Sequence, residues 1–394
     1  MGKNTEVMIK VLFDLSVCQP IGTSKFHGGG IYGCIVVSRL IQEYPNNVAV
    51  IYDHSRFLTP EIVGLIKEKG IATYDLAKTD RLSAFIDGHF DRFYSPLYHK
   101  SYSTLMENGV ELMVTVHGLR ALEINRDLYE CRYAQDAKGF IKALLKWTPV
   151  YKYLDRKYRL QYKRLFAYEK SKIVTVSEHS KASLRYYYPN LAEEKIIVRY
   201  SPNTSDDNED VAISKPCFGE EGRYYLIISA NRWLKNSYRA IMAIEQLLDK
   251  DIVQKSRFIV VGINDKHPIA RRVKHKEKFS FLDYVSKSDL DNLLNNAYAL
   301  IYPTLNEGFG YPPLEAMRFG TPVIASAVTS VPEVCGNAVL YFNPYSIDEI
   351  GNRIIEMENH TVHEKYVLLS KKRYAEVKSK QDYDLERLVK EIID

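Results

Sequence analysis

Short runs of β-branched and aromatic residues alternate with segments of helical apolar spacing along this chain. Strands that alternate with helices form parallel sheets, because a helix is the usual connection between two parallel neighbours. The predicted strands are residues 8–15, 48–52, 112–116, 173–176 and 196–199 in the first half, and 224–229, 257–261, 298–302, 322–325 and 338–342 in the second. The alternation therefore predicts an α/β fold in which each half is a doubly wound sheet.

A chain of 394 residues exceeds one ordinary hydrophobic core and suits two domains of roughly 150 to 200 residues each. Residues 201–222 are polar and acidic, contain Pro and Gly, and show no apolar period, which is typical of a linker. We predict a first domain at 1–205, a second domain at 206–375 and a terminal helix at 376–394. The helix needs a surface to cover, because it has apolar residues at helical spacing. These residues are Leu385, Leu388, Val389 and Ile392.

The composition, with 46% hydrophobic and 26% charged residues, is that of an ordinary globular protein and excludes a disordered or fibrous chain. The longest apolar runs are far shorter than the roughly 20 residues of a membrane-spanning helix, and the first residues lack the apolar core of a signal peptide. We therefore expect a cytoplasmic protein. Five scattered cysteines, none in a C-x-x-C pair, argue against a disulfide framework and a zinc site. The Asp-x-Asp sequences at 289–291 and 382–384 are predicted to lie on helices, so no metal or cofactor is expected.

Residues 126–172 carry thirteen Lys or Arg against five Asp or Glu, interleaved with tyrosines. Within them, residues 138–147 place large apolar side chains between lysines, the pattern of a basic amphipathic helix on an anionic membrane surface. The same pattern fits a helix packed on its own domain with a solvated basic face, and the sequence leaves both interpretations open. A nucleic-acid partner is not expected, because no DNA- or RNA-binding motif accompanies the charge.

The segment LNEGFGYPPLEAMRFGTPVIAS, residues 305–326, combines two carboxylates with a Gly-Phe-Gly and a Pro-Pro pair. Glu307 follows a predicted strand, at the carboxyl edge where open α/β sheets bind their ligands. The glycines let the backbone approach a ligand closely, and the prolines suit the first turn of a helix whose N–H groups attract an anion. Glu315, in that first turn, either favours the helix dipole or contacts a ligand. The segment is therefore a candidate site for a phosphate and a polyol.

This segment resembles the E-x7-E signature of the retaining nucleotide-sugar glycosyltransferases of family 4, the glycosyltransferase group 1 family. The resemblance implies the GT-B fold, in which two Rossmann-like domains face each other and a C-terminal helix crosses back to the first domain. It implies that the first domain binds the acceptor and the second binds the donor, with Glu307 on hydroxyls of the donor sugar and Glu315 on the ribose. The other donor contacts that it implies in this segment are Gly308, Phe309, Gly310 and Leu314.

A second group of candidates follows the first predicted strand of the second half, where a loop holds Arg232 and Lys235. Transfer of a sugar off a diphosphate builds negative charge on the leaving group, which two cations can stabilise in place of a metal. Taken alone, the residues also fit a solvated basic loop. They resemble the family's diphosphate-binding pair, and the resemblance adds Asn236 to the donor site. It also places the nucleotide base against Tyr284 and Val285, where a further predicted strand ends.

His117 ends a predicted strand of the first half and fits a general base, a hydrogen-bond donor to a sugar or an ordinary polar loop residue. The family resemblance favours a contact with the donor sugar, so His117 is a catalytic candidate beside the carboxylate and the two cations. Ser177 is expected to cap the next helix. Similarity to the family's acceptor-side serine motif makes Ser177 and Ser180 acceptor candidates as well.

Residues 28–33 spell G-x-G-x-x-G, and Asp53 falls twenty residues later, as in a dinucleotide-binding fingerprint. That fingerprint needs its first glycine directly after the first strand, whereas residues 16–27 intervene here. The glycines instead resemble the family's loop that approaches the donor diphosphate and the acceptor. The candidates in this loop are Gly28, Gly29 and Gly30.

Taken with these features, the family resemblance implies a retaining, metal-independent, mannosyltransferase-like enzyme. It would move a hexose or deoxyhexose from a nucleotide diphosphate sugar to a glycan or lipid-linked glycan, in synthesis of a surface polysaccharide such as lipopolysaccharide. An NAD-dependent oxidoreductase, a GT-B epimerase or phosphorylase and a non-catalytic sugar-binding protein are the alternatives. Glu307 is either a nucleophile or, as the family suggests, a group that orients the donor while the leaving phosphate takes the acceptor proton. The expected location is the cytoplasm, at the inner face of the cell membrane if 126–172 binds lipid.

Overall fold

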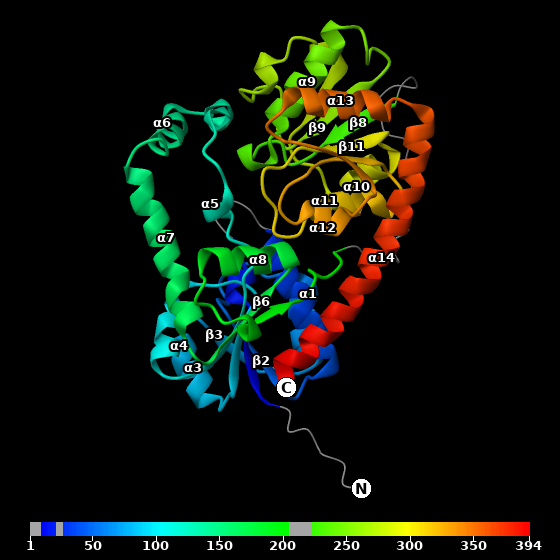
Figure 1. The fold of residues 1–394 in the computed structure, drawn as a ribbon. Coiled ribbons are helices and arrows are strands. Elements are labelled where there is room, and N and C mark those ends of the chain that lie inside the picture. Colours follow the sequence, from blue (N-terminus) through cyan, green and yellow to red (C-terminus); the bar gives the residue numbers. More distant parts are fainter. Residues whose placement is uncertain (1–8, 21–26, 205–222) are drawn as a thin grey trace. The chain divides into compact units, whose positions relative to one another are not determined.

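The structure is a computed structural model that describes residues 9–20, 27–204 and 223–394. The chain forms two compact units (Figure 1). The first comprises Met1–Leu119, Lys157–Thr204 and Ser379–Asp394, and the second comprises Arg120–Arg156 and Ser205–Lys378. Of the predicted linker, residues 205–222 lie outside the described residues. No helix in the described part of the chain is long and apolar enough to cross a bilayer.

The first unit contains a seven-stranded parallel sheet with the strand order β3-β2-β1-β4-β5-β6-β7. The strands are β1 (Val11–Asp14), β2 (Val48–Tyr52), β3 (Thr73–Asp75), β4 (Arg92–Ser95), β5 (Glu111–Thr115), β6 (Ser171–Thr175) and β7 (Ile196–Val198). The order reverses between β1 and β4, and doubly wound sheets bind their ligands at the carboxyl ends of the strands beside such a reversal. Residues that follow these strands are therefore well placed for a site.

Strands β3 and β4 were not predicted from the sequence. β3 is a three-residue edge strand without an apolar run. β4 begins with Arg92, which is buried and donates to Glu111 on β5 and to the backbone carbonyls of Glu391 and Ile392. Because those carbonyls lie about 300 residues further along the chain, no local pattern reveals that this arginine can be buried.

Helices complete the first unit. They are α1 (Gly28–Glu43), α2 (Pro60–Glu68), α3 (Arg81–Asp87), α4 (Ser103–Glu107), most of α7 (Val150–Ala167) and α8 (Glu178–Tyr187), with 3₁₀ turns at Ser16–Cys18, Lys100–Tyr102 and Glu193–Lys195. Since helices alternate with parallel strands, the strands are buried and read as apolar runs, which is why most of them could be predicted.

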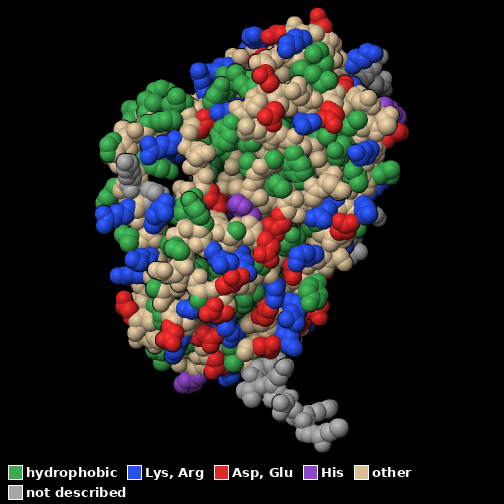
Figure 2. Space-filling model, in the orientation of Figure 1, with side chains coloured by type: hydrophobic (Ala, Val, Ile, Leu, Met, Phe, Trp, Pro, Cys, Tyr) green, Lys and Arg blue, Asp and Glu red, His purple; other side chains and the backbone are tan. Residues whose placement is uncertain are grey.

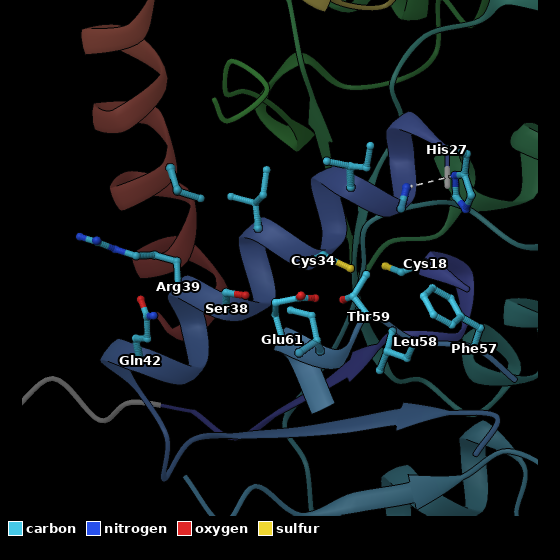
Figure 3. Close-up of a pocket in the computed structure, with 15 residues that line it drawn as sticks. Cys18, His27, Cys34, Ser38, Arg39, Gln42, Phe57, Leu58, Thr59 and Glu61 are labelled. Carbon is cyan, nitrogen blue, oxygen red and sulfur yellow. Dashed lines mark hydrogen bonds between the residues drawn. The ribbon is translucent and has the colours of Figure 1, made fainter. Parts of the chain in front are cut away.

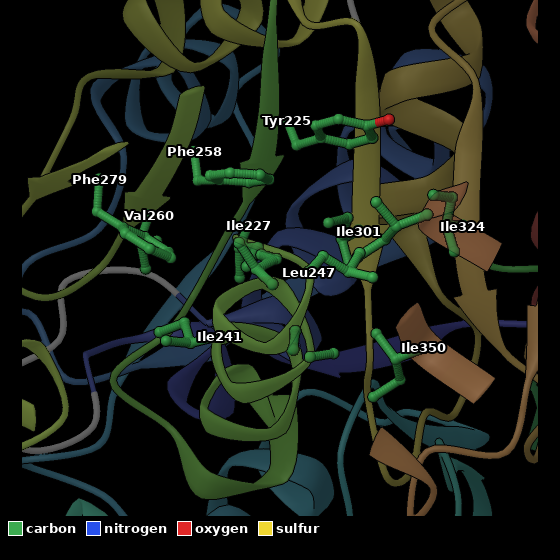
Figure 4. Close-up of a cluster of buried hydrophobic side chains, with 14 of the residues drawn as sticks. Tyr225, Ile227, Ile241, Leu247, Phe258, Val260, Phe279, Ile301, Ile324 and Ile350 are labelled. Atoms are coloured by element: carbon green, nitrogen blue, oxygen red, sulfur yellow. The ribbon is translucent and has the colours of Figure 1, made fainter. Parts of the chain in front are cut away.

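The second unit contains a six-stranded parallel sheet with the order β10-β9-β8-β11-β12-β13. The strands are β8 (Tyr224–Ile227), β9 (Arg257–Val261), β10 (Phe279–Leu282), β11 (Ala299–Tyr302), β12 (Val323–Ser326) and β13 (Val339–Phe342). Its core joins strand residues such as Phe258 and Ile301 to Leu247 of α9 and Ile350 of α13 (Figure 4). The rings of Tyr225 and Phe258 stack with centroids 5.6 Å apart.

The helices of the second unit are α5 (Arg120–Glu123), α6 (Ala137–Leu145), α9 (Ser237–Asp249), α10 (Lys287–Asn296), α11 (Tyr311–Arg318), α12 (Val331–Cys335) and α13 (Ile347–Met357), with 3₁₀ turns at Leu128–Tyr133, Trp233–Lys235, Ala270–Arg272 and Lys276–Lys278. The turn at Trp233–Lys235 and the start of α11 carry the predicted donor-side residues.

Residues 120–156 precede most of the second unit in sequence yet pack with it. The prediction assigned them to the first domain. The guanidinium of Arg239 on α9 donates two hydrogen bonds to the carboxylate of Asp127, at 2.6 and 2.9 Å, and both side chains are buried. The amide of Asn306 donates to Glu123 at 2.5 Å. These contacts hold the segment beside the two loops that contain the candidate residues.

Helix α14 (His360–Ile393) carries the chain back to the first unit. The predicted terminal helix, 376–394, is the end of this longer helix. Its last part belongs to the first unit, where the backbone N–H of Tyr200 donates to Asp384 at 2.9 Å and Arg199 pairs with Glu391. All four of its predicted apolar positions lie in this part, and Leu388, Val389 and Ile392 are buried. The return of the last helix to the first unit is therefore confirmed.

Candidate functional site

Glu307 and Lys235 form a buried ion pair in the second unit. Nζ of Lys235 lies 2.5 Å from Oε1 of Glu307 and 3.0 Å from the hydroxyl of Tyr302. Thr304 donates a further hydrogen bond to Oε1 of Glu307 at 2.7 Å. The sheet explains the meeting, because β8 and β11 are neighbours and the loops after their carboxyl ends carry the two residues.

The pair fixes the charge state of both groups. Burial by itself raises the pKa of Glu307, but the Lys235 ammonium and the hydrogen bonds from Lys235 and Thr304 outweigh burial and lower that pKa to about 2. Burial lowers the pKa of Lys235, against the opposing effect of Glu307, and the positive charges of Arg232 and Arg120 lower it further. Glu307 is therefore a carboxylate at neutral pH, surrounded by cationic side chains of its own unit.

Hydrogen bonds with residues that follow β12 fix the backbone of the Glu307 loop. The backbone N–H of Glu307 donates to Thr329 at 3.0 Å, while the hydroxyl of Ser330 donates to the carbonyls of Glu307 and Phe309 at 3.1 and 2.8 Å. Gly310 caps α11 with φ of +106°, in the region that favours glycine, although a Cβ there would meet no atom closer than 3.9 Å. Conformation, rather than space, requires glycine at this position.

The remaining candidates of this segment divide into inner and outer positions. Phe309 and Leu314 are buried, so their side chains belong to the core, and Gly308 is partly exposed. Glu315 is the fifth residue of α11, just beyond the first turn in which it was predicted. It is partly exposed, and its Oε1 lies 3.8 Å from Nζ of Lys287. The prolines lie at the start of α11, as predicted.

The two cations of the loop after β8 differ in their exposure to solvent. Arg232 is exposed, whereas Lys235 is buried on Glu307. Asn236 adopts a left-handed conformation, with φ of +54°, and its side chain donates to the carbonyl of Pro344 and accepts from Arg239. The structure gives Asn236 a turn-forming role, and its contact with the donor stays a prediction.

Tyr284 and Val285 follow β10, which ends at Leu282 rather than near Val285. Tyr284 is 85% exposed, and Ser286 caps α10 by accepting from the N–H of Asp289 at 3.1 Å. The loop thus lies at the same carboxyl edge as Glu307. Among the described residues, no three His, Cys, Asp or Glu side chains are grouped closely enough to hold a metal ion.

In the first unit, His117 follows β5. Its Nε2 lies 3.0 Å from the carbonyl of Pro96, and its ring meets Tyr32 edge-on at 4.7 Å. Ser177 caps α8 by accepting from the N–H of Ser180 at 3.1 Å, and the Ser180 hydroxyl donates to the carbonyl of His117 at 3.3 Å. Both serines are buried, so the structure supports the capping interpretation of Ser177 and brings both serines beside the backbone of His117.

Gly28, Gly29 and Gly30 form the first turn of α1, so the G-x-G-x-x-G lies inside a helix rather than between a strand and a helix. That position does not suit the dinucleotide fingerprint. A Cβ on Gly29 would lie 2.7 Å from Leu97, and one on Gly30 would lie 2.8 Å from the carbonyl of Cys18. Close packing therefore explains these two glycines.

A cavity of about 400 Å³ in the first unit adjoins this turn (Figure 3). Its lining is largely apolar and includes His27 and Gly30 at the helix start and Leu58. Figure 3 shows the sulfurs of Cys18 and Cys34 near each other at its wall, where the two thiols hydrogen-bond. The predicted acceptor loop thus borders an apolar cavity.

Residues 210–376, which cover most of the second unit, match the family model described as "Glycosyl transferases group 1". Residues 210–376 thus form a domain of the group 1 glycosyltransferases. The match contains the whole E-x7-E segment, so the resemblance stated from the sequence is confirmed. A group 1 glycosyltransferase domain also agrees with the position of Glu307 and Lys235 at the carboxyl edge of a parallel sheet.

Two curated relatives that match parts of the chain are named as mannosyltransferases. The chain is 37% identical over 177 residues to "O-antigen chain mannosyltransferase RfbU" of Salmonella typhimurium, covering 44% of the chain and 46% of the relative. It is 46% identical over 76 residues to "O-antigen chain mannosyltransferase B" of Escherichia coli, covering 19% and 20%. The chain thus spans about half or less of the length of these relatives.

Solved structures share the fold over the whole chain. WaaG, a glycosyltransferase involved in lipopolysaccharide biosynthesis, superimposes with a TM-score of 0.63 at 15% identity, covering 97% of this chain and 99% of that one. Anabaena HepE, solved with UDP and glucose, gives 0.63 at 15% identity, covering 98% and 99%. The predicted GT-B fold is confirmed.

Several residues of this candidate site were not predicted from the sequence. Thr304, Thr329 and Ser330 hold Glu307 and its loop, and Arg120 lies close enough to lower the pKa of Glu307. The signal was available for two of them, since Thr329 and Ser330 follow the predicted strand 322–325 as Glu307 follows its own. Arg120 gave none, because its segment was assigned to the other domain.

Proposed function

We propose that the protein is a retaining glycosyltransferase that moves a mannosyl or related hexosyl unit from a nucleotide diphosphate sugar to a growing glycan of a surface polysaccharide. The observation that carries the proposal is the buried carboxylate of Glu307 paired with Lys235 at the carboxyl edge of the group 1 domain. The choice of mannose is supported by the names of two relatives, both O-antigen chain mannosyltransferases. The choice of a nucleotide donor is supported by a structural neighbour solved with UDP and glucose.

The cationic surroundings suit a diphosphate leaving group. Arg232 is exposed in the loop after β8, and both it and Arg120 act electrostatically on Lys235. Negative charge that develops on a leaving diphosphate is stabilised by fixed cations that need no reorganisation at the moment of reaction. We assign Arg232 and Lys235 to this role, so that the reaction requires no metal ion.

Glu307 is assigned an orienting and stabilising role. With a pKa of about 2 it carries no proton to donate at neutral pH, so it cannot serve as a general acid. Its Oε1 already accepts from Lys235 and Thr304, which lowers its reactivity as a nucleophile. A carboxylate held this way accepts hydrogen bonds from sugar hydroxyls and stabilises positive charge at the anomeric carbon. The acceptor proton is then taken by the leaving phosphate on the same face.

The test combines binding with stereochemistry. Thermal shifts with GDP, UDP, dTDP and ADP, without added metal, identify the nucleotide, since a ligand at 100 times its Kd adds about 2.7 kcal/mol of stability. Its mannose and glucose conjugates are then offered as donors with a glycan acceptor, and the anomeric configuration of the product is read by NMR. Inversion would contradict the retaining mechanism. Release of nucleotide without any glycoside product would contradict transfer.

A further inference from the structure

Helix α6 presents its large apolar side chains to solvent. Phe140, Ile141, Leu144 and Leu145, with Trp147 just beyond the helix, are between 41% and 55% exposed. Within the helix, only Ala143 is buried. Figure 2 shows the resulting hydrophobic surface over α6, at the upper left of the view. A helix packed on its own domain would bury these groups, so the structure does not support that interpretation of the amphipathic pattern.

The exposed residues form parallel rows along the helix. Positions four apart lie on one face, so Phe140 and Leu144 make one row and Ile141 and Leu145 make the next. By the same spacing, a third row beside them contains lysines. The lysines of this row are Lys138, Lys142 and Lys146. The apolar strip is thus bordered lengthwise by ammonium groups.

Two lysines of this row can meet an anionic partner from solvent. Lys138 and Lys142 are exposed, and neither forms an ion pair with a carboxylate of the described residues. Lys146 is directed inward, where it bonds to Glu130 at 2.5 Å and lies over the ring of Trp233 at 5.4 Å. Residues 137–147 contain no acidic side chain. An anionic partner therefore meets positive charge and apolar surface together along the helix, while the carboxylate of Asp136 lies at the helix start, where it accepts from the N–H of Gly139.

We propose that this α6 face, consisting of Phe140, Ile141, Leu144, Leu145, Trp147, Lys138 and Lys142, binds the surface of an anionic lipid bilayer. The apolar rows enter the boundary between headgroups and acyl chains, while the lysine stems extend so that their ammonium groups remain among the lipid phosphates. A bilayer fits better than a protein partner, because the strip is continuous and its hydrogen-bonding groups are the lysines and the indole N–H of Trp147, a residue type that favours the headgroup region. The lysines along its border also match the negative charge of anionic headgroups.

This inference extends the proposed function without depending on it. A glycosyltransferase held at a bilayer would meet acceptors that are attached to lipid. Binding to a bilayer needs neither donor nor acceptor, so it can fail while sugar transfer stands, and it can succeed if the sugar assignment is wrong.

The experiment measures partition of the full chain onto sedimented vesicles of phosphatidylcholine with phosphatidylglycerol, and onto vesicles of phosphatidylcholine alone. We expect binding to the anionic vesicles that weakens as salt is added, because ions screen the lysines. Ile141→Asp with Leu145→Asp should lower the partition coefficient at least about tenfold, and Lys138→Glu with Lys142→Glu should abolish the preference for anionic vesicles. The matched control is Leu368→Asp on α14, at a position 71% exposed, which should bind as the parent does.

Thermal unfolding of each variant, recorded beside the vesicle assay, establishes that lost binding is not lost folding. Absence of sedimentation with anionic vesicles at low salt would overturn the proposal. So would equal loss of binding in the Leu368→Asp control. If instead the parent chain is a dimer that Ile141→Asp with Leu145→Asp converts to monomers, without any vesicle binding by the parent, the face is a protein interface.

Discussion

Nζ of Lys235 lies 2.5 Å from Oε1 of Glu307, and the two side chains are buried together at the carboxyl ends of neighbouring strands. Each charge is tolerated in the interior because the other compensates it. The same pair thus has a structural role in the second unit and a proposed role in sugar transfer. Measurements of turnover and of unfolding free energy can separate these two roles.

Glu307→Gln tests the chemical role. Glutamine keeps the shape of the side chain but not its charge, so it stabilises developing positive charge poorly. We expect kcat to fall by roughly 10²- to 10³-fold. Affinity for the nucleoside diphosphate should change little. Steady-state kinetics and isothermal titration measure the two quantities, and unchanged turnover would remove Glu307 from the mechanism.

Lys235→Met tests the structural role. The substitution leaves a buried carboxylate without its partner, which typically costs about 3 to 5 kcal/mol of unfolding free energy. Adding Glu307→Gln to it removes the uncompensated charge and should restore part of that loss. Urea denaturation of the parent, both single variants and the double variant measures the coupling. Strict additivity of the two single losses would mean that the pair contributes nothing as a pair.

The acid dependence of stability should follow Glu307. Its folded pKa of about 2 lies below the unfolded value near 4.3, so its contribution is complete above the unfolded pKa and declines as pH falls toward the folded pKa. Comparing the parent with Glu307→Gln isolates this group. The difference in unfolding free energy should be larger at about pH 6 than at about pH 3. A difference independent of pH would show that the charge of Glu307 is not what stabilises the fold.

Asp127→Ala should release the segment 120–156 from the second unit. It removes the two carboxylate oxygens that accept from the Arg239 guanidinium and leaves that cation buried with the neutral acceptor Asn236, at an expected cost of about 3 to 5 kcal/mol. Limited proteolysis should then cut between 120 and 156 faster than in the parent. Arg239→Lys should also be destabilising, since a lysine cannot form the paired hydrogen bonds. Unchanged cleavage would assign the attachment of this segment to other contacts.

Two helical glycines should respond in opposite directions to alanine. A Cβ on Gly33 of α1 would lie 2.7 Å from Pro96, so Gly33→Ala should lower the unfolding free energy by about 1 to 3 kcal/mol. A Cβ on Gly64 of α2 would meet nothing within 4 Å, so Gly64→Ala should raise it by about 0.5 to 1 kcal/mol. Thermal and urea denaturation compare them, and equal effects would show that space at Gly33 is not limiting.

A site residue could be predicted from the sequence where a local pattern, such as a preceding apolar strand, marked its position. Glu307 and Lys235 could be found because each follows an apolar strand, and the carboxyl ends of parallel strands share one edge. The left-handed turn at Asn236 was not predicted, because no distinctive sequence pattern marks it, and the donor contact of Asn236 stays a prediction. The pairing of Asp127 with Arg239 was beyond reach, because 112 residues separate them.

The path of α14 has a consequence for how the chain acquires its structure. Arg92 and Arg199 of the first unit receive their partners from residues 391 and 392, which are made after the entire second unit. A nascent first unit therefore holds Arg92 with its partner Glu111 but without its two carbonyl acceptors throughout synthesis of the second unit. Folding cannot proceed strictly from the N-terminal side, and completion of the earlier unit must wait for the later one.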